Sequence, residues 1–98
     1  MQTDKSSLPL AGVRVLDLSR VLAGPWSAMV LGDLGAEVVK IEHPDRGDDT
    51  RDWGVRVGKT ETAYFNSVNR NKRSITLDLQ TPEGQQIVRE LAKTSDIV

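Results

Sequence analysis

The chain has 98 residues, a net charge of −1, one histidine and no cysteine. These counts exclude disulfides, thiolate metal sites and thiol catalysis, and they argue against an all-protein zinc site and a general nucleic-acid binder. No apolar run approaches the about 18 residues of a membrane span, and the first ten residues, MQTDKSSLPL, lack the pattern of a signal or transit peptide. We therefore expect a cytoplasmic protein that uses no metal and binds neither nucleic acid nor a membrane.

The stretch from Val13 to Glu42 predicts a β–α–β unit. Its first strand, Val13–Leu18, is mostly aliphatic and is followed by a glycine–proline turn. A helix follows over Trp26–Leu34, where apolar residues recur at helical spacing, and Gly35 suits the left-handed position after its last turn. The next strand is Glu37–Ile41. Two apolar strands joined by a helix predict an α/β fold, with a parallel sheet covered by flanking helices.

The turn Ser19–Gly24 is the expected ligand site of this unit. The carboxyl end of the first strand meets the amino end of the helix there, where free N–H groups and the helix dipole favour phosphate or carboxylate. A plain β–α connection is an equally good interpretation. The glycines do not follow the G-x-G-x-x-G spacing of a dinucleotide site, although Glu42 lies where a Rossmann domain keeps its ribose-binding acid. The pattern favours a small molecule that carries phosphate.

A long polar connection follows, from Glu42 to Lys59, and it contains Trp53. Connections longer than about 12–15 residues are usually functional or disordered, and the indole favours function. The segment Thr62–Asn69 predicts two helical turns. Tyr64 within it and Trp53 before it each either line a pocket or pack against other side chains. The basic cluster that comes next is either a phosphate contact or a solvated turn, the latter being favoured; it consists of Arg70, Lys72 and Arg73.

The last quarter of the chain predicts a strand, a helix and the start of another strand. Ser74–Leu79 alternates as a half-buried strand does, and Thr81-Pro82-Glu83 has the cap, proline and acid that begin a helix. Ser95–Val98 resembles the first residues of a further strand, so we expect a truncated domain that spans residues 8–98. Met1–Ser7 is expected to be a disordered lead.

The remaining ionisable residues do not form a catalytic pattern. His43 lies in a loop before Pro44 and is more often a bystander than a base. Asp17, Asp33 and Asp78 are single carboxylates within regular elements, without a partner at the spacing of an acid/base pair. The residues alone therefore indicate binding and do not indicate a reaction.

Three segments resemble the amino-terminal region of the family III CoA-transferases. These are LAGVRVLDLSRVLAGPWSAMVLGDLGAEVVKIE, then GDDTRDWG, then YFNSVNRNKRSITLDLQTPEG, in the family's order over about Leu8 to Val98. The resemblance implies a Rossmann-like parallel sheet, incomplete in this chain, within subunits several times longer. It also implies a homodimer of interlocked subunits when the protein is full length.

The resemblance further implies the reaction. Family members move CoA from an acyl-CoA donor to a free carboxylic acid through an aspartyl-CoA thioester, a covalent route that replaces one difficult step with easier ones. The nucleophilic aspartate lies beyond Val98 in the family, so we assign no catalytic residue and expect this chain alone to be inactive. Coenzyme A and its acyl thioester are then substrates. The sequences of these motifs are most similar to those of members that use succinyl-CoA and dicarboxylic acids such as glutarate.

Site residues follow from the positions that match the family. Arg20, Leu22 and Ala23 correspond to the segment beside CoA and the reacting centre, and His43 to a position that contacts the nucleotide end and is often arginine. Leu77, Asp78, Leu79 and Gln80 correspond to the lining of the adenine and ribose. Trp53 and Tyr64 match aromatic residues near the acyl and acceptor pocket, and Lys72 and Arg73 are possible phosphate contacts. Leu22 replaces the glutamine of oxalate-using members, which argues against oxalate as acceptor.

Three other functions remain open from the sequence. A 2-methylacyl-CoA racemase of the same family would abstract an α-proton and transfer no CoA. A non-catalytic nucleotide-binding or assembly domain would have the same β–α–β unit without chemistry. A dehydrogenase is disfavoured, because the glycine fingerprint is absent.

Overall fold

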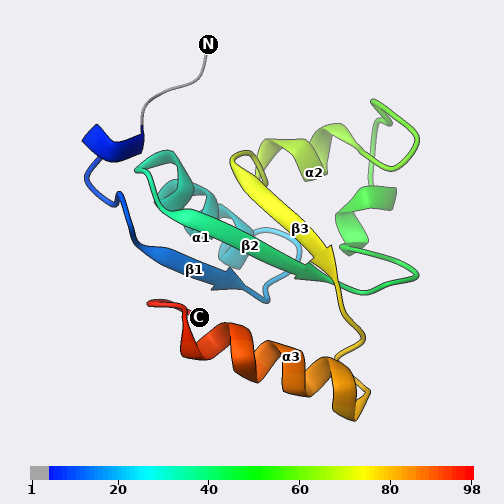
Figure 1. Ribbon diagram of the computed structural model, residues 1–98. Helices are drawn as coiled ribbons and strands as arrows, with labels where there is room; N and C mark the ends of the chain where they lie inside the picture. Colours follow the sequence, from blue (N-terminus) through cyan, green and yellow to red (C-terminus); the bar gives the residue numbers. More distant parts are fainter. Residues whose placement is uncertain (1–4) are drawn as a thin grey trace.

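Three parallel strands form one sheet in the computed structural model, which describes residues 5–98. The strands are β1 (Arg14–Asp17), β2 (Glu37–Glu42) and β3 (Lys72–Thr76), and they lie side by side in the order β1-β2-β3 (Figure 1). Ile97 forms a parallel bridge with Val15 on the other side of β1, and its carbonyl accepts a hydrogen bond from Leu16 N at 2.9 Å. The expected strand after the last helix is thus present as a single bridge, and its position beside β1 agrees with the first four strands of the Rossmann order 3-2-1-4-5-6.

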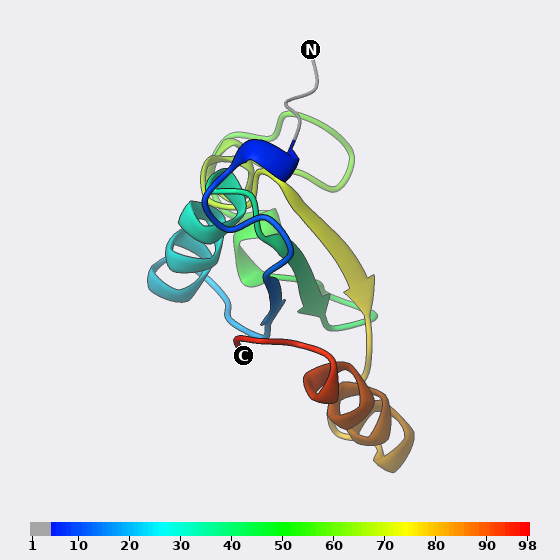
Figure 2. The ribbon, with the colours of Figure 1, turned by 60° about the vertical axis from the view of Figure 1, so that its left-hand side comes forward.

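Helices lie on both sides of this sheet. α1 and α3 lie on opposite sides of it (Figure 2). Residues 1–4 of the expected disordered lead lie outside the described part, and residues 5–7 form a short 3-10 turn. The helical elements are η1 (Lys5–Ser7), α1 (Ala23–Asp33), η2 (Asp49–Asp52), α2 (Ala63–Ser67) and α3 (Pro82–Lys93). The α/β class and the flanking helices expected from the sequence are confirmed.

The β–α–β unit closes over a small aliphatic core. Val15 of β1 and Val38 of β2 point to the same side of the sheet and pack against Ala28 of α1 and Ala36. Gly35 adopts a φ of +109°, as expected for the residue that ends α1, and Leu8 lies so close that a Cβ there would be 2.7 Å from its Cβ. The predicted strand–helix–strand order is therefore confirmed.

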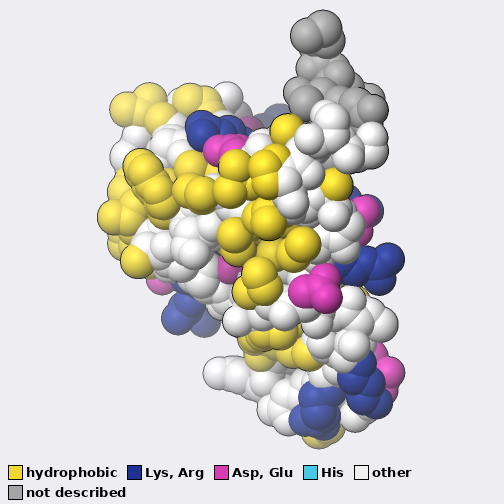
Figure 3. Space-filling view, turned by 90° about the vertical axis from the view of Figure 1, so that its left-hand side faces the viewer, with side chains coloured by type: hydrophobic (Ala, Val, Ile, Leu, Met, Phe, Trp, Pro, Cys, Tyr) yellow, Lys and Arg dark blue, Asp and Glu magenta, His cyan; other side chains and the backbone are white. Residues whose placement is uncertain are grey.

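α1 is apolar on its outer side as well as its inner side. Four hydrophobic residues at four-residue spacing are 41–55% exposed: Leu22, Trp26, Val30 and Leu34. Broad areas of hydrophobic side chains are visible on the face of the molecule shown in Figure 3. A helix that is hydrophobic on all sides is typical of one covered from both sides.

β3 begins two residues earlier than the sequence predicts. Lys72 pairs with Val38 and Thr76 with Glu42, so the strand covers Lys72–Thr76, whereas the prediction was Ser74–Leu79. The charges of Lys72 and Arg73 are typical of a turn, but the pairing with β2 decides the boundary. The beginning of α3 is as predicted, since the Thr81 side chain accepts a hydrogen bond from Gly84 N and Pro82 is the first helical residue.

The long polar connection has internal structure. Asp48 precedes η2 and accepts hydrogen bonds from the backbone N–H and hydroxyl of Thr50 at 2.9 and 2.8 Å. Thr62 caps α2 by accepting from Phe65 N, and it donates its hydroxyl hydrogen to the Thr50 carbonyl. The bond between Thr62 and Thr50 joins the start of α2 to η2, so these two elements lie together beside the sheet.

Candidate functional site

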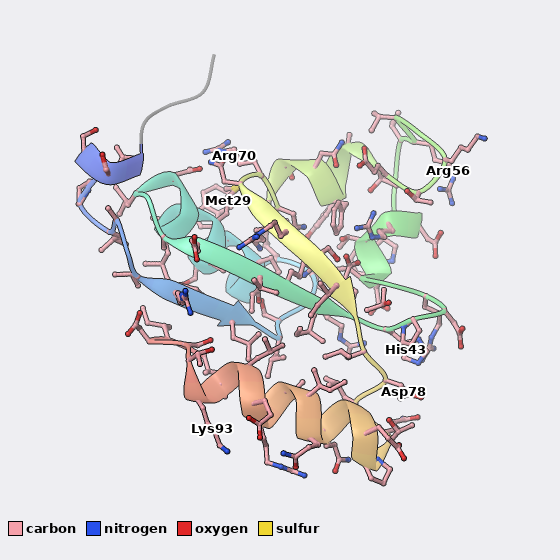
Figure 4. All side chains as sticks on the ribbon, viewed as in Figure 1. Met29, His43, Arg56, Arg70, Asp78 and Lys93 are labelled. Carbon is pink, nitrogen blue, oxygen red and sulfur yellow. The ribbon has the colours of Figure 1, made fainter. Side chains whose placement is uncertain are left out.

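The carboxyl ends of the three strands bring the predicted CoA residues to one edge of the sheet. β1 ends before the turn that contains Arg20 and Leu22, β2 ends before His43, and β3 ends before Leu77. Leu77 N donates to the Glu42 carbonyl at 3.0 Å, which fixes the segment after β3 beside the segment after β2. Figure 4 shows His43 and Asp78 at this same end of the molecule. The edge is where parallel sheets bind ligands.

Two buried side chains, those of Asp17 and Lys40, form hydrogen bonds with the turn between β1 and α1. The Ser19 carbonyl accepts a hydrogen bond from Lys40 Nζ at 2.9 Å, and Ser19 N donates to Asp17 Oδ1 at 2.8 Å. Val21 has a φ of +76°, a left-handed conformation that is rare for a β-branched residue and is often found at functional sites. Gly24 is needed here, because a Cβ at that position would lie 2.3 Å from the Ser19 Cβ. These contacts together fix the backbone conformation of the turn.

The amino end of α1 has no side-chain cap. Leu22 occupies the N-cap position and its carbonyl accepts from Trp26 N at 2.8 Å. The first N–H groups of α1, starting with Ala23, are therefore not satisfied by a capping side chain. Such groups, with the positive end of the helix dipole, stabilise an anion.

The segment after β3 is a compact turn against α3. Asp78 O accepts hydrogen bonds from both the N–H and the hydroxyl of Thr81, at 3.2 and 2.8 Å, and Asp78 Oδ1 accepts from Gln80 N at 2.9 Å. The Leu79 carbonyl accepts from Gln85 Nε2 at 3.0 Å. The predicted adenine and ribose segment is thus held from both ends, with Leu79 and Gln80 exposed to solvent.

A polar hollow of about 490 Å³ opens beside His43. His43 Nδ1 accepts a hydrogen bond from Asp45 N at 3.1 Å, so the neutral ring carries its proton on Nε2 and presents that nitrogen as a donor. The hollow is rich in charge. Its lining consists of Glu42, His43, Pro44, Asp45, Arg46, Gly47, Arg51, Asp52, Arg56, Lys59, Thr60, Ser74 and Thr76.

Trp53 and Tyr64, the two aromatic residues predicted near the acyl and acceptor pocket, contact each other. Their ring centroids are 5.6 Å apart with an interplanar angle of 77°, an edge-to-face contact. Trp53 directly follows η2, where Asp49 lies 3.9 Å from Arg20 of the β1–α1 turn. The aromatic pair and that turn are therefore connected through η2. Neither ring lines the hollow beside His43.

A layer of buried ion pairs lies under the site, and the sequence interpretation missed it. Lys40 Nζ is 2.9 Å from Asp48 Oδ2, with side chains 1% and 0% exposed. Lys72 Nζ is 2.9 Å from Asp17 Oδ2, and both side chains are 2% exposed. Charges this deeply buried are found only when paired. One signal was available: Lys40 places a charge inside the predicted strand Glu37–Ile41, which was expected to be covered on both sides, but it does not indicate the partner of that charge.

Glu42 belongs to this layer and is not placed as a ribose ligand. Its carboxylate accepts from Arg51 Nε and Nη2 at 2.7 and 2.8 Å, from Asp48 N at 2.8 Å and from the Ser74 hydroxyl. Burial alone would raise the pKa of Glu42, but these donors outweigh it and lower the pKa to about 2. The pKa of Asp48 is lowered in the same way, because the Thr50 N–H and Lys40 outweigh its burial.

Acid is therefore expected to weaken the domain through Glu42. A carboxyl whose pKa falls from 4.5 unfolded to about 2 folded stabilises the fold above pH 4.5, and this contribution is lost as the pH falls toward 2. We expect a loss on the order of 2 kcal/mol in the free energy of unfolding between pH 6 and pH 3, measured by urea denaturation. A Glu42→Gln variant should be less stable at pH 6 and show a flatter pH profile. Parallel profiles for the two proteins would contradict this account.

The basic cluster is dispersed rather than gathered for a phosphate. Arg70 donates to both oxygens of Asp33, with Nη2 to Oδ2 at 2.7 Å. Lys72 Nζ donates inside the protein to Asp17, to the Pro25 carbonyl and to Asn69 Oδ1. Its three donors are thus occupied, and the structure does not present Lys72 to a phosphate. Arg73 is exposed on the opposite side of the sheet, because neighbouring residues of a strand alternate.

The described residues show neither a metal centre nor a membrane span. No group of three or more metal-ligating His, Cys, Asp or Glu side chains is gathered within residues 5–98. None of the helices in that range is both long and apolar enough to cross a bilayer.

The fold and the sequence both match a known family. The family model described as CoA-transferase family III matches residues 10–98. The chain belongs to CoA-transferase family III. The resemblance to this family, predicted from the three motifs, is thereby confirmed.

Named relatives have similar sequences over almost the whole chain. The succinyl-CoA:glutarate CoA-transferase of Mus musculus is 58% identical over 97 residues, which are 98% of this chain and 22% of the mouse protein. The succinate–glutarate CoA-transferase of Agrobacterium fabrum is 50% identical over 96 residues, 92% of this chain and 24% of that protein. A crystal structure of a CAIB/BAIF family protein from Brucella suis superposes with a TM-score of 0.84 at 48% identity, covering 92% of this chain and 25% of that one. The chain thus spans about a quarter of the length of these family members.

Proposed function

We propose that this chain forms part of the CoA site of an enzyme that transfers CoA from succinyl-CoA to a dicarboxylic acid such as glutarate. The observation that carries the proposal is the similarity, at 50–58% identity, to proteins named for that reaction. The carboxyl edge of the sheet supports it, since the β1–α1 turn, His43 and the turn at Asp78 lie along one side of the molecule. A ligand as long as CoA needs such an extended edge.

The roles of the residues follow from their places along this edge. The uncapped N–H groups at Ala23 and the fixed turn at Arg20 and Leu22 would hold the reacting end of the thioester. Nε2 of His43 would donate to the nucleotide end, and Leu77 to Gln80 would line the adenine and ribose. Trp53 and Tyr64 would face the acyl group or the acceptor acid. Arg73 is left out of this site because it lies on the opposite side of the sheet.

The chemistry itself would belong to a carboxylate outside this chain. An aspartate of the complete subunit would attack the thioester and form a mixed anhydride with release of CoA thiolate. The thiolate would then attack the aspartyl carbonyl of the anhydride and expel the donor acid as succinate, which leaves the aspartyl-CoA thioester. The acceptor carboxylate would attack this thioester and release CoA thiolate, which would attack the acceptor's carbonyl in the second anhydride to give the new acyl-CoA and the free aspartate. The residues of this chain would bind and orient CoA, and subunits would pair as interlocked homodimers.

The test uses protein made from the complete reading frame that contains this sequence. Incubation with succinyl-CoA and glutarate should yield glutaryl-CoA and succinate, and mass spectrometry should detect a covalent enzyme–CoA adduct. Absence of both products with every dicarboxylate tried would overturn the transferase proposal. Exchange of an α-proton in 2-methylacyl-CoA without any CoA transfer would identify a racemase instead.

A further inference from the structure

Lys40 carries a charge at a position where an aliphatic residue is usual. It lies inside β2, the central strand of the described sheet, and its side chain is 1% exposed. Strands of parallel sheets that are covered on both sides are usually continuous hydrophobic runs. A buried ion pair adds little net stability, because apolar residues of similar volume are often as stable or more stable. The pair that Lys40 forms with Asp48 is therefore not explained by stability alone.

The Lys40 ammonium makes a second contact that no apolar side chain could make. Its Nζ donates to the Ser19 carbonyl at 2.9 Å, and the same atom lies 2.9 Å from Asp48 Oδ2. Ser19 precedes the turn residues Arg20 and Leu22, which are assigned to the reacting end of the thioester. One charge-assisted hydrogen bond thus connects this turn to the central strand.

Asp48 fixes the position of the ammonium. Its side chain is fully buried, and its Oδ1 accepts from the N–H and the hydroxyl of Thr50 at 2.9 and 2.8 Å. Asp48 N donates to Glu42 Oε1 at 2.8 Å, and Arg51 Nε lies 2.7 Å from that same oxygen. Because each partner is held by further bonds, the Lys40 side chain has one defined position.

The turn needs such support because its backbone conformation is unfavourable. Val21 has a φ of +76°, and a β-branched residue keeps such a conformation only where neighbouring contacts determine it. Lys40 holds the carbonyl two residues before Val21, and Lys72 Nζ donates to the Pro25 carbonyl, at the start of α1, at 2.9 Å. With both ends of the turn fixed, the N–H groups that begin at Ala23 keep one direction.

We propose that Lys40 is a positioning residue for the transfer reaction: its ammonium fixes the Ser19 carbonyl and thereby sets how the β1–α1 turn meets the reacting end of the thioester. This inference rests on the proposed function, since it adds a buried residue beneath the same site. A misplacement of reacting groups by about 1 Å can cost about a hundredfold in rate, whereas contacts to the rest of CoA are unaffected. The loss of Lys40 should therefore appear in kcat and not in KM.

The experiment replaces the ion pair with neutral side chains of similar size in the protein made from the complete reading frame. Lys40→Met/Asp48→Asn leaves no buried charge of this pair, and the new amide oxygen can still accept from Thr50, so the fold should be retained. The donor to Ser19 is lost. We expect kcat for CoA transfer from succinyl-CoA to glutarate to fall about tenfold or more, with KM for succinyl-CoA within about twofold of the wild type. Amide exchange of residues 19–24 should become faster in the absence of CoA.

Two control variants separate positioning from general damage. Val38→Ala opens a cavity on the same side of β2, two residues from Lys40, and lowers stability without removing a bond to the turn. Asp33→Asn/Arg70→Met neutralises a different ion pair, of 2.7 Å, at the opposite end of α1 from the turn. Both controls should retain kcat and KM within about twofold.

Wild-type kcat in Lys40→Met/Asp48→Asn would overturn the positioning role and leave the proposed function intact. A higher KM with unchanged kcat would make Lys40 a contributor to binding, and an equal loss of kcat in Val38→Ala would assign the effect to stability; each result contradicts the proposal. No CoA transfer by the wild-type protein would reject the proposed function, and the positioning role with it. If circular dichroism shows the first variant to be unfolded, Lys40→Gln/Asp48→Asn takes its place with the same expected results, because its amide is one bond shorter than the lysine side chain.

Discussion

Replacing Lys72 with methionine is expected to lower the free energy of unfolding by about 3–5 kcal/mol, since it leaves the buried Asp17 carboxylate without its cation. The variant would also remove the donor to the Pro25 carbonyl, at the start of α1, and to Asn69 Oδ1. Urea denaturation followed by circular dichroism measures the loss. The methylene chain of methionine fills the same space, so the effect reports charge rather than volume.

Two companion variants separate this cause from a general sensitivity of β3. Arg73→Met changes the neighbouring, exposed cation and should alter the free energy of unfolding by no more than about 0.5 kcal/mol. Asp17→Asn/Lys72→Met removes both charges while Asn Oδ1 still accepts from Ser19, so it should recover much of the lost stability. Equal losses for Lys72→Met and Arg73→Met would contradict the buried pair.

Gly84→Ala is expected to displace the turn at Asp78, because a Cβ on Gly84 would lie 2.0 Å from the Asp78 carbonyl oxygen. The obstacle is the Asp78 backbone, which cannot rotate away as a flexible side chain does. We expect a cost of about 1–3 kcal/mol in the free energy of unfolding, as for other overpacked sites. Affinity for CoA should fall as well, because the displaced segment is the proposed lining of the adenine and ribose.

The matched control is Gly58→Ala. Its nearest neighbour would be the Glu61 Cβ at 4.0 Å, so the added methyl group meets no obstacle. This variant should retain both stability and affinity for CoA. If Gly84→Ala behaved like Gly58→Ala in both measurements, the close contact between Asp78 and α3 would be disproved.

Local patterns were sufficient to predict the β–α–β unit. Two aliphatic runs, the helical spacing between them and Gly35 after the helix predict β1, α1 and β2 in the right order, although α1 begins at Ala23 and not at Trp26. The expectation that ligands bind at the β1–α1 turn needs only the chain direction of the strand and the helix. It could therefore also be made from the sequence. The residues proposed to contact CoA lie along the predicted edge for the same reason.

The partners in the buried ion pairs could not be predicted, because they depend on strand order and register. Asp17 and Lys72 are 55 residues apart, and they meet only because β1 and β3 flank β2 with these side chains on one side of the sheet. From sequence alone the first appears as a single carboxylate and the second as part of a basic turn. The same dependence explains why the predicted start of β3 was two residues too late. The strand begins at Lys72 because that residue pairs with Val38 of β2.

The central claim, that this carboxyl edge holds CoA, is tested most directly by hydrogen exchange of the complete protein with and without CoA. Bound CoA should slow amide exchange in three separate segments, at residues 18–24, 42–47 and 77–81, which follow β1, β2 and β3. Exchange in α3 beyond its first turn should change little. CoA binding that leaves all three segments unprotected would contradict the account.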